Sequence, residues 1–310
     1  MSNTAKVKTK KRIKLAPYML LIPWFIGMAL FRVYPIIASF VNSLYQFQPI
    51  RGTREFIGFD NYVRIVGGSR NAYGDWVWNF PHFWDSVSAT LTYVLLGTPL
   101  VLIMAFFVAF ILNFKLKGVN LFRTAYYIPS ILGGNVAVAI VWSQVFGGDG
   151  PVNAILSIFG VDPISWTRDE FFAPFTLIFL SAWQFGSVML IFLAALQNVS
   201  PTLYEAASID GAKKTRQLFS ITLPLVTPVL LFNTVNVLLR HFQEFNAAYL
   251  ITLRGPNRAT DFLVILIYEY AFRRMQFGFA LAMSMMLLLI IGLLTLIVFI
   301  TSKYWVHYSD

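Results

Sequence analysis

The chain has 310 residues, of which 57% are hydrophobic and only 12% are charged, whereas soluble domains usually carry about a quarter charged residues. That balance excludes an ordinary soluble domain, and the net charge of +10 does not indicate nucleic-acid binding, because six of the 24 basic residues directly precede the first apolar block. With no cysteine and three scattered histidines, the sequence predicts no disulfide, no metal site and no cofactor.

Residues 1–14 form a basic tail that we expect to lie in the cytoplasm, close to anionic membrane lipid. The tail and the apolar run after it could form a cleaved signal peptide, but the run is too long and lacks a convincing small-residue cleavage site. We interpret it as the first of six spans, each longer than the ~20 residues that cross a bilayer. The spans are predicted at residues 15–45, 83–114, 119–146, 172–197, 221–250 and 277–302. The fold class is therefore an all-α transmembrane domain over residues 15–303.

The orientation follows from the Lys and Arg residues of the loops, which are enriched on the cytoplasmic side. One alternate set of loops and tails holds twelve of these residues in 49 positions, and the opposite set holds nine in 88. We therefore predict that both termini and the loop at residues 200–220 are cytoplasmic. The largest external loop then covers residues 46–82, where Trp76 and Trp78, with Trp84 close behind, suit a membrane-interface belt. These rings could alternatively stack on sugars, but we favour the belt.

The loop at residues 200–220 is predicted to fold as a polar helix-turn-helix. Ser200 is a suitable N-cap, Pro201 suits the first helical position, and Asp210 with Gly211 can turn the chain through a positive φ. The sequence has no phosphate-binding G-x-x-x-x-G-K-[ST] motif and no other catalytic signature, so we expect a non-catalytic subunit. The loop is therefore a candidate surface for contact with a partner protein.

The segment from Tyr204 to Ala212, which reads Tyr-Glu-Ala-Ala-Ser-Ile-Asp-Gly-Ala, resembles the E-A-A-x-x-D-G-A loop of bacterial ABC importer permeases. The carbohydrate-uptake permeases are the most similar, and the likeness extends to residues 56–62, 122–129, 142–153, 192–197 and 268–280. The resemblance implies that the loop fits a cleft of the ATPase subunit and transmits its closure to the spans. The residues that inherit this ATPase-coupling role are Glu205, Ala206, Ala207, Asp210 and Gly211.

The same resemblance implies an importer in a bacterial cell (inner) membrane that translocates a sugar or oligosaccharide. Its expected partners are a second, unlike permease subunit, two ATP-binding cassette subunits, and an extracellular or periplasmic solute-binding protein. The substrate is expected to be a carbohydrate. The spans are expected to contact membrane lipid.

Polar side chains inside the spans are costly in lipid and therefore mark candidate sites. The fifth span places Arg240 and Glu244 four residues apart, as a possible ion pair on one helical face. This face lines a substrate path or packs against a second permease subunit, and we favour the path. The candidate path residues are Trp183, Gln184, Asn236, Arg240, Gln243 and Glu244, with Asn135 and Gln144 as weaker candidates.

Two other classes of function remain as alternatives. An ion-coupled secondary transporter would also be polar inside, but it would not need the loop at Glu205. An intramembrane enzyme would need convergent catalytic groups, whereas Glu244 is the only acid clearly within a span and His241 its only nearby histidine. After the fifth span, Arg254 is predicted at the outer mouth, either as a contact for a binding protein or anionic ligand or as a solvated loop arginine.

Overall fold

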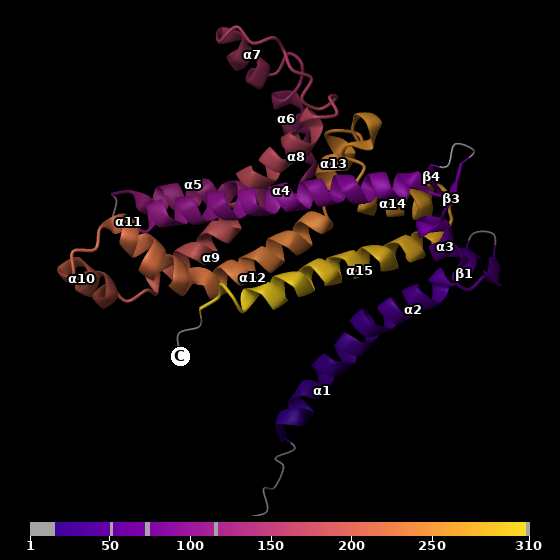
Figure 1. Cartoon of the computed structure of the whole chain (residues 1–310), viewed down its shortest axis with the longest axis horizontal. Helices are drawn as coiled ribbons and strands as arrows, with labels where there is room; N and C mark the ends of the chain where they lie inside the picture. The colour runs from indigo at the N-terminus through magenta and orange to yellow at the C-terminus, as the bar shows by residue number, and fades with distance from the viewer. Residues whose placement is uncertain (1–15, 50–51, 72–74, 115–116, 308–310) are drawn as a thin grey trace, which may run out of the picture.

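A computed structural model describes residues 16–49, 52–71, 75–114 and 117–307, so the predicted basic tail at residues 1–14 lies outside the described residues. The described chain is mostly helical, and Figure 1 shows its longest helices running side by side. The main helices are α1 (Ala16–Met28), α2 (Tyr34–Ser43), α4 (Pro81–Leu112), α5 (Val119–Leu132), α6 (Val136–Val145), α8 (Phe172–Trp183), α9 (Gly186–Gln197), α12 (Leu223–Phe242) and α15 (Phe277–Ser302). Shorter helices are α3 (Asp60–Val66), α7 (Pro151–Ile158), α10 (Pro201–Ile209), α11 (Lys214–Gln217), α13 (Asn246–Leu250) and α14 (Leu263–Tyr268).

Short irregular turns join several of these helices. The turns at Ala29–Val33, Leu218–Thr222 and Glu269–Arg273 are π-helical, and Pro256–Arg258 is a 3-10 turn. The first and second π-turns run directly into α2 and α12, so the chain continues along one axis through each of them.

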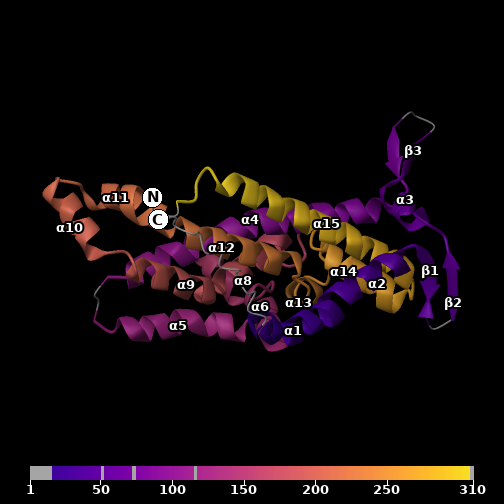
Figure 2. The ribbon, with the colours of Figure 1, turned by 90° about the horizontal axis from the view of Figure 1, so that it is seen from below.

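Two small hairpins depart from the all-α prediction. In the first, β1 (Tyr45–Gln48) pairs antiparallel with β2 (Thr53–Phe56), and in the second, β3 (Gly68–Arg70) pairs with β4 (Trp76–Trp78). The sequence Tyr-Gln-Phe-Gln of β1 alternates apolar and polar side chains, which is the strand pattern that our assignment of residues 46–82 to loop overlooked. Both hairpins lie at the end of the molecule opposite α10 (Figure 2). We call these two ends the hairpin end and the α10 end.

Helix α4 lies at the centre of the packing, because it or its N-cap contributes to each of the four buried apolar clusters. Small residues let neighbouring helices approach it, as is usual between helices in lipid. At Gly97 a Cβ atom would lie 3.2 Å from the ring of His241 on α12. The side of the fold away from α4 is apolar and exposed: α1 and the second half of α15 present large apolar side chains to the surroundings.

Four helical segments of the described chain are long and apolar enough to cross a membrane, or up to six if each bent pair counts as one span. The bent pairs are α5 with α6, at 105°, and α8 with α9, at 45°. The sequence predicted one span over residues 119–146 and one over residues 172–197, without a bend in either. The first bend has a local cause: Gly134 has a φ of +76°, and the side chain of Asn135 caps α6 by accepting a hydrogen bond from the Ala137 backbone N–H.

Candidate functional site

The first candidate site is the α10 loop, defined as residues 200–220. Pro201 occupies the first helical position of α10 as predicted, and Ser200 is its N-cap residue. The Ser200 hydroxyl does not cap the helix, however, because it hydrogen-bonds to the Thr202 hydroxyl at 2.8 Å. The start of α10 is therefore defined by proline geometry rather than by a side-chain cap.

The turn after α10 is a complete Schellman motif. Gly211 has a φ of +76°, the Gly211 N–H donates to the Ser208 carbonyl at 3.1 Å, and the Ala212 N–H donates to the Ala207 carbonyl at 2.8 Å. A Cβ on Gly211 would meet no other atom within 4 Å. Glycine is therefore required there for its backbone conformation and not for space.

Hydrogen bonds inside the α10 loop fix its two helices to each other. The Gln217 amide is buried and donates to the Ser208 hydroxyl at 2.9 Å and to the Ala212 carbonyl at 3.1 Å. The Tyr204 hydroxyl lies 2.8 Å from the Thr222 hydroxyl, at the start of α12. The loop is therefore a folded unit with a polar connection to the long helix that follows it.

The α10 loop presents apolar side chains and small residues on its surface. Leu203, Ile209 and Phe219 are exposed by 43%, 88% and 67%. Glu205 and Ala206 are exposed between them, together with Asp210 and Gly211, whereas Ala207 is half-buried. Figure 1 shows α10 at the tip of the molecule, beyond the long helices. An apolar protrusion with exposed small residues suits docking into a groove of another protein.

The second candidate site is a small cavity where the two bent helix pairs meet, which we call the central cavity. Its volume is about 30 Å³, enough for one or two water molecules. Its lining is mixed polar and apolar, and includes the side chains of Gln184 and Glu244. The full lining is Tyr93, Gly134, Asn135, Val138, Ala139, Leu180, Ser181, Gln184, Glu244, Asn246 and Ala247.

The two bends beside this cavity are held together by one hydroxyl group. The Ser130 hydroxyl donates to the Gln184 carbonyl at 2.9 Å and accepts from the Ser187 N–H at 3.0 Å. The Asn246 side chain donates to the Gly134 carbonyl at 3.2 Å. The helix breaks leave these backbone groups without helical partners. The side chains of Ser130 and Asn246 pair them instead, as the membrane interior requires.

The predicted path residues divide into two groups. Gln184 and Glu244 meet at the central cavity. Asn236, Arg240 and Gln243 lie exposed on the chain's surface along and just after α12, and the Trp183 ring packs against Trp142 with centroids 5.5 Å apart and the ring planes tilted by 33°. Gln144 is exposed on α6.

The ion pair suggested for Arg240 and Glu244 is not formed: no ion pair joins these two described residues. The physical reason is that α12 ends at Phe242, so the two residues do not share a helical face. The Glu244 carboxylate instead accepts a hydrogen bond from the Ala247 N–H at 2.9 Å, at the start of α13.

Sequence reasoning missed several residues of the central cavity, including Tyr93, Ser181 and Asn246. Tyr93 is buried against the His241 ring, with centroids 5.0 Å apart, and His241 hydrogen-bonds to the Thr98 hydroxyl at 2.9 Å. The Gly133-Gly134-Asn135 run inside an apolar block was the available signal of a break. Within the described residues no group of three or more His, Cys, Asp or Glu could hold a metal ion.

Arg254, in the segment between α13 and α14, is partly exposed and is held by two carboxylates. It donates to both oxygens of the buried Asp261 carboxylate at 2.8 Å and also to Glu269, which accepts from Arg274 as well. Burial alone would lower the pKa of Arg254, but hydrogen bonds and charges from the two carboxylates raise it overall. Burial alone would raise the pKa of Glu269, but hydrogen bonds from Arg274 and Arg254 and their positive charges lower it overall.

This ion-pair cluster joins the two ends of a short backbone segment. Four non-glycine residues of the segment lie in the left-handed region of backbone conformation: Leu253, Arg254, Asn257 and Arg258. Arg258 also donates to Asp261, at 3.0 Å. Such backbone conformations cost free energy and persist where surrounding contacts fix them. The cluster therefore supplies the contacts that hold this segment in place.

The fold and these sites define a helical membrane protein with a folded protrusion at one end and a small cavity, lined by polar and apolar groups, between broken helices. Residues 74–305 match the family described as "Binding-protein-dependent transport system inner membrane component". The chain belongs to this family, which confirms the resemblance found in the sequence to carbohydrate-uptake ABC permeases. It is thus a permease component of the ABC importer class in the inner membrane.

Individual relatives cover nearly the whole chain. The probable ABC transporter permease protein YesP of Bacillus subtilis (strain 168) is 42% identical over 98% of this chain and 96% of its own length. The lactose transport system permease protein LacF of Rhizobium radiobacter is 31% identical over 98% of this chain and 99% of its own. The solved structure of a bacterial ABC transporter involved in import of the acidic polysaccharide alginate matches with a TM-score of 0.73, covering 93% of this chain and 95% of that one. At 22% identity, that likeness shows a shared fold.

Proposed function

We propose that this chain is a permease subunit of an ATP-driven, binding-protein-dependent importer that translocates a sugar or oligosaccharide. The observation that carries the proposal is the α10 loop, a folded protrusion with exposed Glu205, Ala206 and Ile209 at one end of a membrane domain. The carbohydrate assignment is supported by relatives such as the lactose permease protein, which matches over almost its entire length.

The proposed orientation places the α10 end in the cytoplasm, with both termini on that side and each bent helix pair counted as one of six spans. The enrichment of Lys and Arg in this set of loops supports it. The last described residues also return to this end, where the His307 N–H donates to the Thr227 hydroxyl on α12 at 2.9 Å. The hairpin end then faces the solute-binding protein.

In this mechanism two ATPase subunits bind ATP, close, and move the α10 loops of two permease subunits. Glu205, Ala206, Ala207, Asp210 and Gly211 are assigned to the ATPase contact. The movement passes into α12 through the contact between Tyr204 and Thr222 and the continuous π-turn that joins α11 to α12. A loop without internal hydrogen bonds could deform instead of transmitting the displacement, and the buried Gln217 amide opposes such deformation.

The substrate path is proposed to run along α12, between this chain and a second, unlike permease subunit. Asn236, Arg240 and Gln243 are exposed on the isolated chain, although exposed polar groups are costly against lipid. A polar path shared with the second subunit would provide them with water and sugar hydroxyls as partners. Gln184 and Glu244 would contribute to the same path through the central cavity, and Trp183 would offer a ring face.

The proposal is tested by reconstituting the complete transporter in liposomes and measuring ATP-dependent uptake of sugars delivered by the binding protein. The Glu205→Lys variant should assemble in the membrane but lose most ATP-driven uptake, because a reversed charge would lie at the ATPase contact. If uptake by this variant were unchanged, and if an ion gradient rather than ATP drove it, the result would favour the ion-coupled secondary transporter. A binding protein that carries only amino acids or metal ions would overturn the carbohydrate assignment.

A further inference from the structure

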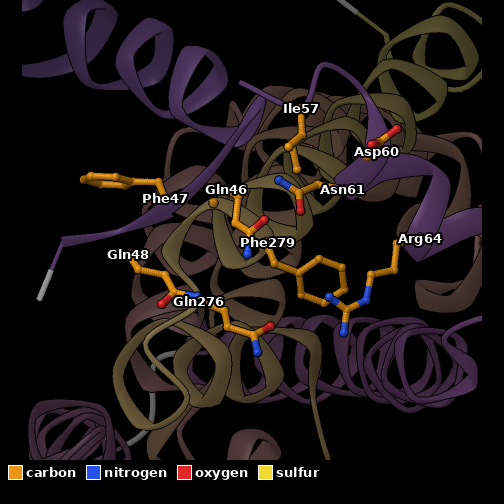
Figure 3. Close-up of a pocket in the computed structure, with 10 residues that line it drawn as sticks. Gln46, Phe47, Gln48, Ile57, Asp60, Asn61, Arg64, Gln276 and Phe279 are labelled. Atoms are coloured by element: carbon orange, nitrogen blue, oxygen red, sulfur yellow. The ribbon is translucent and has the colours of Figure 1, made fainter. Parts of the chain in front are cut away.

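The hairpin end holds a further pocket, which shares no lining residue with the central cavity and which we call the hairpin pocket. It encloses about 300 Å³ between β1, α3 and the first turn of α15 (Figure 3). That volume is at the lower end of the range for small-molecule sites, roughly 300–1,000 Å³. Its lining is Gln46, Phe47, Gln48, Ile57, Asp60, Asn61, Arg64, Gln276, Gly278 and Phe279.

The polar groups of the hairpin pocket are largely free to bind a ligand. Within the described part of the chain, the side chains of Gln46, Gln48 and Gln276 have no hydrogen-bond partner, and Asp60 and Arg64 form no ion pair. Figure 3 shows the three amides directed toward the same space, with Gln46 and Gln48 on one face of β1 and Phe47 turned away. Three amides, one carboxylate and one guanidinium offer both donors and acceptors without a net charge.

Apolar side chains accompany these polar groups. Ile57 is half-buried in the lining, whereas Phe279 is only 3% exposed and the Arg64 guanidinium lies over its ring, 4.6 Å from the centroid. A sugar unit presents many hydroxyl groups together with apolar C–H groups, so it needs amide and charged groups beside an apolar surface. A site for a phosphate or a metal ion would instead need a clear excess of one charge.

The walls of the hairpin pocket are held by close packing and by hydrogen bonds. A Cβ on Gly278 would lie 2.0 Å from the Tyr45 carbonyl oxygen, so α15 can approach β1 this closely only with glycine there. The buried Asn61 side chain donates to the Ser43 carbonyl at 2.7 Å and to the Tyr45 carbonyl at 3.3 Å, which anchors α3 to the end of α2. The pocket walls are thus held in place before a ligand binds, which lowers the entropic cost of binding.

We propose that the hairpin pocket binds one sugar unit of the transported carbohydrate on the binding-protein side of the membrane. The proposal rests on the proposed function and adds a site outside the α12 path. Gln48 and Gln276 bind hydroxyl groups, Arg64 donates to a further ring oxygen or hydroxyl, and Ile57 contributes an apolar contact. A sugar unit released by the binding protein is thereby held at the surface before it enters the path.

The test uses the complete transporter in lipid nanodiscs, without the binding protein. The probe is whichever of lactose, maltotriose and trigalacturonate the wild-type transporter imports fastest, and its binding is measured by isothermal titration. Gln48→Ala and Gln276→Ala should each weaken binding about tenfold, because each removes hydrogen bonds to the sugar. The matched control is Glu55→Gln on the neighbouring strand β2, which is outside the pocket lining and should bind as the wild type does.

Unchanged binding in both glutamine variants would overturn the hairpin pocket as a sugar site while leaving the proposed function intact. A second result would also overturn it: the wild-type transporter binds no sugar on its own, and both glutamine variants bind the sugar-loaded binding protein more weakly. The pocket would then be a protein-docking surface. Import of none of the three sugars would overturn the carbohydrate function, and this inference with it. Thermal unfolding of each variant serves as the folding control, and we expect wild-type values because neither amide makes an internal hydrogen bond.

Discussion

Gly186, the first residue of α9, lies against the backbone of α5 so closely that a Cβ atom on it would be 2.3 Å from the Tyr126 carbonyl oxygen. The same Cβ would lie 2.7 Å from the Ser130 hydroxyl, which joins the two bent helix pairs. This contact therefore sets how closely the helices on either side of the central cavity can pack.

Gly186→Ala should destabilise the protein by about 1–3 kcal/mol, because the added methyl group collides with backbone that cannot move independently. Thermal unfolding in nanodiscs measures the effect. The matched control is Gly292→Ala in α15, where a Cβ would meet nothing within 4 Å and alanine is the better helix former. Equal stabilities of the two variants would contradict the proposed importance of this contact.

Ser130→Ala should lower stability by about 1 kcal/mol and reduce uptake, because the Gln184 carbonyl and the Ser187 N–H both lose their hydroxyl partner. The comparison is Ser157→Ala, whose exposed hydroxyl bonds only to its own helix. If the transport rate and the thermal stability of Ser130→Ala equal those of the wild type, water replaces the hydroxyl group and the two bends do not need this hydrogen bond.

Gln217→Ala should loosen the α10 loop without unfolding the membrane domain. The substitution leaves the Ser208 hydroxyl and the Ala212 carbonyl without their amide donor. Hydrogen exchange of residues 200–220 should become faster, and ATP hydrolysis should become less well coupled to uptake. Thr215→Ala, an exposed neighbour on α11, is expected to change neither quantity. Slow exchange retained in Gln217→Ala would show that the Schellman turn alone orders the loop.

The ion-pair cluster of Arg254, Asp261 and Glu269 should make the segment between α13 and α14 sensitive to acid. The folded-state pKa of Glu269 is lowered, so its stabilising contribution is present above the ordinary glutamate pKa of about 4.3 and is lost as pH falls through the lower folded value. The raised pKa of Arg254 adds no change in this range, because the guanidinium stays charged.

The protection of residues 251–262 against hydrogen exchange, taken relative to the intrinsic exchange rate at each pH, should therefore fall below about pH 4 in the wild type. Glu269→Gln should be less protected at neutral pH and lose less further protection in acid. The exposed Glu55→Gln on β2 serves as the control for general charge effects. An identical acid response in wild type and Glu269→Gln would remove Glu269 as the titrating group.

The sequence was most informative where local chemistry decides the structure. The run from Pro201 to Gly211 specifies a helix that starts at a proline and ends at a left-handed glycine, and both features are present. The apolar blocks likewise located the helical segments that are candidates for membrane spans. These features depend on neighbours in the sequence, so a single chain can reveal them.

Features that depend on contacts between distant segments were not predictable. The central cavity joins Tyr93 on α4 to Gln184 and Asn246, which are far apart in sequence. The bend after α5 was missed because Gly133 and Gly134 lie within an apolar block that is long enough for a straight span. The ion pair expected between Arg240 and Glu244 failed because α12 ends between them, and the Ala247 N–H attracts the carboxylate instead.

Helix α4 has 32 residues, which corresponds to a rod of about 48 Å. Near its last turns it packs against α9 in the cluster around Phe192, and at its first turn it packs against α15 in the cluster around Phe279. One helix is therefore packed against partners near both ends of the molecule, and Pro99, between these contacts, removes one hydrogen bond from its backbone. A displacement imposed at the α10 end would reach the hairpin end only as far as α4 stays straight at Pro99, so bending at this proline would decide how much of the displacement arrives.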